Sequence, residues 1–315
     1  MHAHKNITLG IFLGSDQLDF SAVGEKIKEL RKQVGLSQKE LSHNICTQAQ
    51  ISKIEKGEVL PLSSTLYLIS QRLGIDVNYF FDIGTTPRLD YVIETSRQLK
   101  AARRNTDYET IKQIVEAEEK NPLFTRNKRH YQILLWHKAI YVYEVDKDFP
   151  KALELIEDAI ALTFEKIFTE KEIEIFISKG IFHYEEGLLK ESLQIYYKAL
   201  SYLQKIPHLQ DETIKSRLYF NIAKALTDLN EYESSISYCK EGIDWAIQKD
   251  NLYLLAHFHY HIGYNYEQQE NFKLASNYMK EALVIFHLVK DSRYTDYIQE
   301  KIDRWQEEHN DRLTD

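Results

Sequence analysis

The apolar residues near the start of the chain recur at helical spacing. Val23, Ile27, Leu30 and Val34 fall on one face of a helix, and Gly35 follows them. Glycine adopts the left-handed conformation that commonly ends a helix without a steric penalty. The pattern therefore predicts a first amphipathic helix that ends at Gly35.

Two capping signals follow within twenty residues. Ser37 and Glu40 form a capping box, in which the serine caps the helix and the glutamate returns to the serine backbone. Thr47 and Gln50 repeat the spacing, and the helix that they open runs to Gly57. Two capped helices of about two turns each are typical of a helix-turn-helix.

Two further helices complete this N-terminal set. Pro61 introduces a fourth helix that carries Leu66, Ile69 and Leu73, and residues 76–81 form a fifth. The five short helices have enough apolar positions for one small core.

The third helix presents a polar face opposite its apolar one. At 100° per residue Ile51 and Ile54 point inward, while glutamines lead its N-terminal tip. Glutamine suits a bidentate contact with adenine, alanine suits a thymine methyl, and lysine suits phosphate or guanine. The predicted DNA-binding residues are Gln38, Thr47, Gln48, Ala49, Gln50, Ser52, Lys53 and Lys56.

The charge distribution supports this interpretation. The chain carries 40 Lys and Arg against 48 Asp and Glu, a net charge of −8. Residues 21–74 hold eight of those basic residues and five of the acidic ones, which leaves 32 against 43 for the rest. A basic segment of +3 beside an acidic remainder of −11 is typical of a DNA reader joined to a domain with another role.

The segments Gly35–Leu41 and Gln50–Gly57 closely resemble the Xre/Cro-type helix-turn-helix family, over roughly residues 21–82. The resemblance implies a lambda-repressor-like, five-helix domain that binds double-stranded DNA as a homodimer on a palindromic operator. Such a dimer places one reading helix in each half-site.

The remainder of the chain repeats with a period of about forty residues. A small residue, a large residue three positions later, a polar turn and a second helix recur around Ile140, Gly180, Ala223 and Gly263, with a degenerate first copy near Ala117. This is the TPR pattern of paired helices. Five repeats and a capping helix over residues 293–308 are predicted. The whole fold is then all-α, a helix-turn-helix domain followed by a right-handed TPR-like α-solenoid.

The first helix of each TPR hairpin lines the concave surface, so its outward positions are the ligand candidates. Aromatic residues interleaved with Asn, Lys and His suit an extended peptide. The predicted peptide-binding residues here are Tyr141, Tyr184, Asn221, Lys224, His257, Tyr260, His261 and Tyr264, and His137, Glu174, Ile177, Ile181, Arg217 and Phe220 share these faces.

Catalytic and metal signals are weak. His257 and His261 share a helical face, but no third ligand accompanies them. The sequence has no Gly-rich phosphate loop, no HExxH and no nucleophile elbow. The two cysteines lack CxxC spacing. We therefore predict no enzyme activity, no cofactor and no metal site.

Helix-turn-helix and TPR-like repeats together resemble the RRNPP group of peptide-sensing regulators of Gram-positive bacteria. The resemblance implies a homodimer that activates transcription when a short signalling peptide binds, as in quorum sensing. It also implies that Asn221 holds the peptide backbone and that Lys100, Arg103 and Arg104 meet its carboxylates. Ile181 stands where a second backbone-binding Asn is expected, so the peptide should differ from those of known members.

The expected organisation is an N-terminal extension over residues 1–20, the helix-turn-helix over 21–75, a junction over 76–90 and the repeats with their cap over 91–309. The apolar run at residues 7–13 is too short for a membrane span and a poor signal peptide. A cytoplasmic protein without membrane contact is expected.

Two other functions fit the same pattern. The repeats of a helix-turn-helix repressor could serve only to dimerise it, without a peptide ligand. A regulator could instead bind and inhibit a partner protein, as related TPR proteins act on response regulators. The basic reading helix argues against the second as the sole activity.

Overall fold

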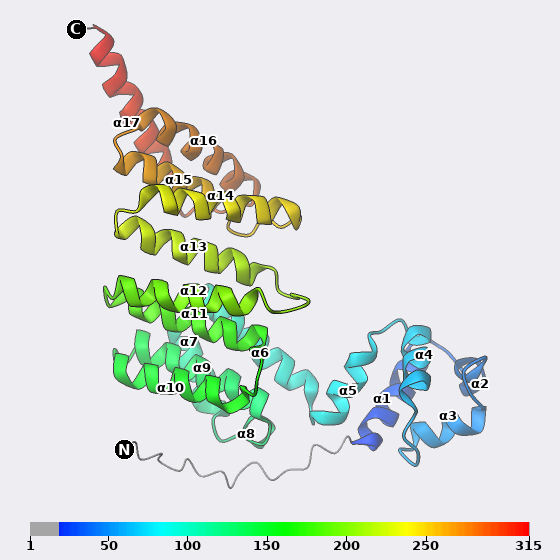
Figure 1. Ribbon diagram of the computed structural model, residues 1–315. Helices are drawn as coiled ribbons and strands as arrows, with labels where there is room; N and C mark the ends of the chain where they lie inside the picture. Colours follow the sequence, from blue (N-terminus) through cyan, green and yellow to red (C-terminus); the bar gives the residue numbers. More distant parts are fainter. Residues whose placement is uncertain (1–18, 315) are drawn as a thin grey trace. The chain divides into compact units, whose positions relative to one another are not determined.

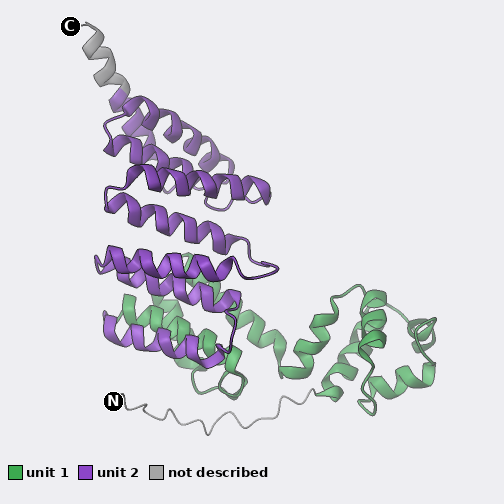
Figure 2. Cartoon of the chain, in the orientation of Figure 1, with its two compact units in different colours: residues 1–146 green, residues 147–315 purple. Residues whose placement is uncertain are grey.

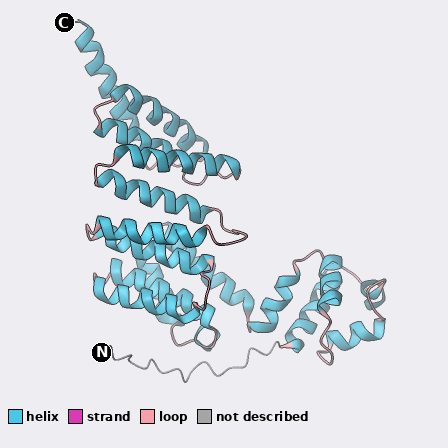
Figure 3. Cartoon of the chain, viewed as in Figure 1, coloured by secondary structure: helices cyan, strands magenta, loops and turns pink. Residues whose placement is uncertain are grey.

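The computed structural model describes residues 19–314, with side chains to Trp305. This part of the chain consists of helices joined by loops and turns, and it contains no strand (Figures 1 and 3). It divides into two compact units, of which the first ends at Asp146 and the second begins at Lys147 (Figure 2). The all-α prediction is confirmed.

The first unit contains the five short helices of the head and four more. They are α1 (Phe20–Gln33), α2 (Gln38–Ser42), α3 (Gln48–Glu55), α4 (Ser63–Leu73), α5 (Val77–Thr85), α6 (Leu89–Arg104), α7 (Tyr108–Glu118), α8 (Pro122–Thr125) and α9 (Lys128–Glu144).

The helix ends of the head follow the local signals in the sequence. The Ser37 side chain accepts from the Glu40 backbone N–H, and Glu40 accepts from the Ser37 N–H, as a capping box requires. Gly35 and Gly57 have φ values of 82° and 71°, so both lie in the left-handed region. The fifth helix, α5, is longer than predicted and ends at Thr85.

One apolar core holds the head together. Its fully buried members come from α1, α2, α3, α4 and α5 and include Ile27, Leu41, Ile51, Ile69 and Phe80. Helices α1 and α3 lie so close that a β-carbon at position 24 would be 2.1 Å from the Ile54 carbonyl oxygen. Gly24 is therefore required by this contact. The remaining helices of the unit pack in sequence, α6 on α7 and both α7 and α8 on α9.

The second unit is a stack of helical hairpins. Its helices are α10 (Phe149–Thr163), α11 (Glu170–Glu185), α12 (Leu189–Leu203), α13 (Thr213–Asp228), α14 (Tyr232–Gln248), α15 (Leu255–Gln268), α16 (Phe272–Leu288) and α17 (Thr295–Thr314). The predicted capping helix thus begins at Thr295 and is longer than expected.

Small residues let the helices of this unit approach one another, as the repeat pattern predicted. A β-carbon at Gly180 would lie 2.2 Å from the Tyr196 ring, and one at Gly242 would lie 2.2 Å from the Phe258 ring. Large residues therefore occupy the space that each glycine leaves. Adjacent helices contact one another in chain order from α10 to α17 (Figure 1).

The division at Asp146 falls inside the predicted repeats, so the first hairpins belong to the same compact unit as the head. Helix α6 spans the end of the predicted junction and the start of the first predicted repeat. The boundaries at residues 75 and 90 stay a prediction, and most of the predicted extension 1–20 lies outside the described residues. No helix in the described part of the chain is long and apolar enough to cross a membrane.

Candidate functional site

The outer face of α3 is exposed as the sequence predicted. Ile51 and Ile54 are 0% and 1% exposed and anchor the helix in the core. On the other side Gln48, Ala49 and Lys53 are exposed. A helix with one face fixed in this way has a defined surface to present to a DNA groove.

The remaining residues of this surface frame its two ends. Thr47 caps α3 by accepting a 3.1 Å hydrogen bond from the Gln50 backbone N–H. Gln50 and Ser52 are half-buried, and Lys56 is exposed just past the end of the helix. The N-terminal tip of α3 therefore carries the positive end of the helix dipole and two glutamine amides that bond no side chain of the described residues.

A buried ion pair joins the reading helix to the other two helices of the motif. Glu55 of α3 is 4% exposed and accepts from Arg31 of α1 at 2.6 Å and from the Gln38 amide of α2 at 2.9 Å. Burial opposes the charged carboxylate, but the hydrogen bonds from Arg31 and Gln38 outweigh it and lower the pKa of Glu55. Gln38 was predicted to contact DNA, and its amide N–H is used here to position α3.

Sequence reasoning missed three residues that shape this surface. Arg31 and Glu55 lie on otherwise apolar inward faces, and a charge on such a face was the available signal. Arg72 of α4 donates to the carbonyls of Glu40 and Leu41, both at 3.1 Å, and to that of His43. A cation on the last carbonyls of α2 stabilises that helix end.

The basic trio of the first predicted repeat lies at the C-terminal end of α6. Lys100 and Arg104 are exposed, while Arg103 is half-buried with its guanidinium 4.3 Å from the centre of the Trp136 ring. The three side chains thus share one end of one helix, and Arg103 is fixed by cation–π contact.

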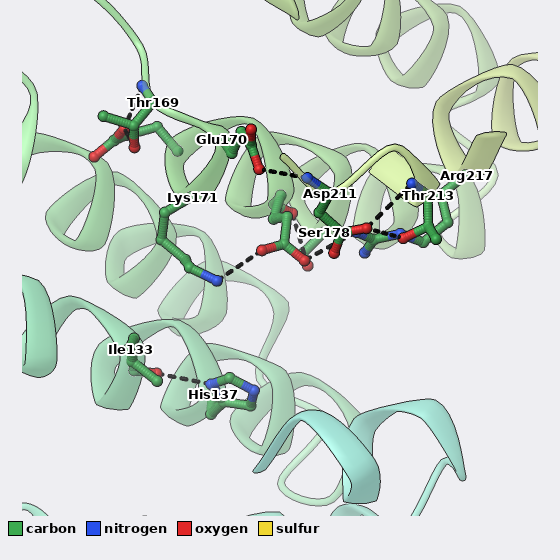
Figure 4. Close-up of polar contacts among 11 residues, drawn as sticks. Ile133, His137, Thr169, Glu170, Lys171, Ser178, Asp211, Thr213 and Arg217 are labelled. Carbon is green, nitrogen blue, oxygen red and sulfur yellow. Dashed lines mark hydrogen bonds and ion pairs between the residues drawn. The ribbon is translucent and has the colours of Figure 1, made fainter. Parts of the chain in front are cut away.

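Two candidates on α9 are more buried than predicted. Tyr141 is 5% exposed, with the Lys112 ammonium 5.5 Å from its ring centre, and burial raises the pKa of its phenol. His137 is 2% exposed, and its Nδ1 lies 2.8 Å from the Ile133 carbonyl oxygen (Figure 4). Both side chains contribute more to packing here than to an open surface.

In the second unit, two candidates from neighbouring hairpins meet. The Lys224 ammonium of α13 lies 4.5 Å from the centre of the Tyr184 ring of α11. The Tyr184 hydroxyl donates a hydrogen bond to Asp228, one turn beyond Lys224. Burial, reinforced by this bond, raises the pKa of Tyr184 above its ordinary value.

Asn221 and His261 differ sharply in their surroundings. Asn221 is half-buried, and its amide makes no hydrogen bond within the described part of the chain. His261 was predicted to be outward-facing, but it is 6% exposed and its Nε2 lies 2.9 Å from the Thr227 hydroxyl. Thr227 also bonds Ser235 and Asn265 in the same buried polar cluster.

The other candidates of α15 form a cluster of rings. The His257 ring packs edge-on against Phe286 at 5.1 Å, Tyr294 at 5.6 Å and Phe220 at 5.9 Å between ring centres. Tyr260 stacks between Tyr264 and Tyr294, at 6.5 Å and 6.2 Å. Arg293 lies 5.8 Å from the centre of the Tyr294 ring, and Lys301 lies 5.8 Å from that of Tyr264. Five of these rings are partly exposed, and we call them the α15 ring cluster: Phe220, His257, Tyr260, Tyr264 and Tyr294.

The described side chains bring together no group of three His, Cys, Asp or Glu residues that could hold a metal ion. The histidines of α15 have other contacts. His261 bonds Thr227, and His259 Nδ1 lies 2.8 Å from Glu281.

Comparison with known protein families agrees with this geometry. Residues 96–306 match the RNPP family C-terminal domain. The chain belongs to the RNPP family. Residues 27–80 match a helix-turn-helix family, which covers α2, α3 and most of the head.

Solved structures with the same fold include PlcR of Bacillus thuringiensis in complex with the peptide PapR7 and DNA. That match has a TM-score of 0.80 at 22% identity and covers 88% of this chain and 99% of PlcR. ComR from S. thermophilus, in complex with DNA and its signalling peptide ComS, matches with a TM-score of 0.57 at 18% identity, over 89% and 98% of the two chains. The predicted resemblance to the RRNPP group is thereby confirmed.

One curated relative is named as a phosphatase. Response regulator aspartate phosphatase I of Bacillus subtilis (strain 168) is 21% identical over 286 residues, which span 91% of this chain and 67% of the relative.

Proposed function

We propose that this RNPP-family chain is a sequence-specific, DNA-binding transcription regulator, and specifically an activator, that acts in the cytoplasm as a homodimer. A short signalling peptide bound by the inner helices of its repeats controls DNA binding, as in quorum sensing. The observation that carries the proposal is the pairing, in one chain, of a capped and exposed reading helix with an RNPP C-terminal domain.

The DNA half of the proposal rests on α3. Its inward face is fixed by Ile51, Ile54 and Glu55, so Gln48 and Gln50 are presented at the tip on a rigid helix. The related PlcR and ComR structures contain DNA, which supports the same partner here. A homodimer follows because one short helix covers only one half-site.

The peptide half rests on Asn221 and the α15 ring cluster. An amide that bonds no described residue can bond the backbone of an extended peptide, and neighbouring rings can accept its apolar side chains. PapR7 and ComS occupy the PlcR and ComR structures, which supports a peptide as the ligand class. Residues 76–95 would couple the repeats to the head.

Selection of DNA from a random double-stranded pool tests the first half. The wild type should enrich a two-fold symmetric sequence, and Gln48→Ala with Gln50→Ala should cost about 1–3 kcal/mol per lost base contact and relax the preference. Lys53→Ala should instead flatten the salt dependence. Unchanged affinity in the double glutamine variant would remove α3 from the reading role.

Two measurements test the other half. Mass spectrometry of ligands retained by native protein should find a short peptide, and calorimetry with that peptide should show weaker binding by Asn221→Ala. Sedimentation should show a dimer. A retained peptide that leaves operator affinity unchanged, or no retained peptide, would favour a repressor whose repeats serve only to dimerise it.

A further inference from the structure

Asn221 lies between two cationic side chains on the same face of α13. Arg217 precedes it by four residues and Lys224 follows it by three, which are the spacings of neighbours on a helix surface. The three side chains therefore form a stripe with an uncharged amide at its centre. A role for this stripe in ligand binding rests on the proposed peptide-sensing function.

The Arg217 end of this stripe is held by a buried ion pair. The buried carboxylate of Glu174, 4% exposed, pairs with Lys171 at 2.7 Å and with Arg217 at 2.9 Å. Lys171 of α11 and Arg217 of α13, which pair with this carboxylate, are labelled in Figure 4. In addition, the Arg217 Nε–H is buried and has no hydrogen-bond partner within the described residues.

The Lys224 end has a cation without an ion pair. No carboxylate of the described chain lies within 4.0 Å of the Lys224 ammonium, which instead lies over the Tyr184 ring. Asp228, one turn away, is the nearest candidate on α13, but it accepts the Tyr184 hydroxyl. Tyr184 thus contacts the Lys224 ammonium with its ring and the Asp228 carboxylate with its hydroxyl. The N–H donors of Lys224 can therefore bind another anion.

An apolar surface adjoins the stripe. Phe220 is the neighbour of Asn221 in sequence, and its ring meets His257 and His261 edge-on, at 5.9 Å and 5.6 Å between centres. Burial lowers the pKa of both histidines, which disfavours their charged forms. The α15 ring cluster therefore suits an uncharged side chain.

We propose that Lys224 binds a carboxylate of the peptide. This site lies beside Asn221 and the α15 ring cluster, which under the proposed function hold a peptide group and an apolar side chain. The ligand class is thus a short peptide with a carboxylate close to an aromatic or aliphatic residue. The carboxylate is either the free C-terminus or an acidic side chain.

Three synthetic heptapeptide pools, used as probes with the full-length protein, distinguish the two sources of the carboxylate. The first has neutral side chains and a free C-terminus, the second has the same sequences amidated, and the third is amidated and carries one Asp. Native mass spectrometry measures what is retained, and calorimetry measures the affinity of retained peptides. We expect the amidated neutral pool to bind about tenfold or more weakly than a pool with a carboxylate.

Two lysine variants provide the matched comparison. Lys224→Gln should remove the preference for a carboxylate, and Lys224→Arg should restore it. Lys215→Gln is the control, because Lys215 lies on the same helix and its ammonium is 4.1 Å from the centre of the Trp245 ring, away from the stripe. Lys215→Gln should keep the preference of the wild type.

The outcomes separate this inference from the function on which it rests. Equal retention of acid and amide pools, or an equal loss in the Lys215 and Lys224 variants, would overturn the carboxylate site and leave peptide sensing in place. Failure of the wild type to retain any peptide would overturn both.

Discussion

Helices α13 and α15 occupy the same place in successive repeats, yet the side chains at one equivalent position differ in burial and in hydrogen bonding. Asn221 lies two residues before the small residue Ala223, and His261 lies two residues before Gly263. Asn221 is half-buried with an amide that no described residue bonds, whereas His261 is 6% exposed and bonded to Thr227.

The buried polar cluster explains the difference. Thr227, Ser235 and Asn265 are 4%, 0% and 0% exposed, and each bonds the others or a carbonyl. Leaving a buried polar group without a hydrogen bond destabilises the fold by more than one such bond stabilises it. A further polar side chain that bonds Thr227 is therefore favoured in this cluster. His261 does so. Position in a repeat therefore does not by itself make a side chain available to a ligand.

The largest expected effect comes from a substitution in the buried polar cluster. Asn265→Ala should lower the free energy of unfolding by about 3 kcal/mol, because it leaves a cavity and removes partners from Thr227 and Ser235. Chemical denaturation of the full-length protein measures it.

Asn221→Ala is the matched control for that substitution. It should change stability by less than about 0.5 kcal/mol, since its amide bonds no described residue, while weakening peptide binding. Similar losses of stability in the two asparagine variants would contradict the proposed contrast.

A pH dependence of stability is the next largest effect. Burial lowers the pKa of His261 to about 4, from an ordinary value of 6.5. Between these two pH values the unfolded chain binds the proton more readily than the folded one. The contribution of neutral His261 to the free energy of unfolding is therefore fully present above pH 6.5, and about 2–3 kcal/mol of it is lost as the pH falls toward 4.

Denaturation at a series of pH values, with His261→Gln beside the wild type, checks this. The variant should lose much of the slope between pH 6.5 and 4. His257, whose pKa is also lowered by burial, should leave a smaller slope of the same sign. Identical pH profiles for the two proteins would exclude His261 as the titrating group.

The smallest expected effect on stability concerns the partly exposed contacts of Tyr184. Tyr184→Phe removes the hydroxyl that occupies Asp228, and it should cost no more than about 1 kcal/mol in stability because the bond is partly exposed to solvent. Asp228 would then be released to pair with Lys224, so affinity for a carboxylate-bearing peptide should fall. Calorimetry that shows stronger binding instead would mean that Asp228 does not compete for Lys224.

The head illustrates how far the sequence could predict a site. The exposed residues of α3 could be located because helical periodicity and the Thr47 cap fix which face is outward. A DNA contact of Gln38 stays a prediction, but the bond of its amide to Glu55 is not indicated by its position at the start of α2. The partner of a long polar side chain depends on what lies across the fold, which periodicity does not specify.

The sequence by itself determined the helices and the kind of fold. Capping pairs such as Ser37 and Glu40, and the small residues that recur every forty positions, act over a few residues or between adjacent helices, so they can be read locally. Only the tertiary structure decided which polar side chains are used internally. Arg31 and Glu55 are 24 residues apart, and Thr227 and His261 are 34 apart. Those pairs form because burying a charge or a polar group is unfavourable until a partner reaches it, and the partner is supplied by packing.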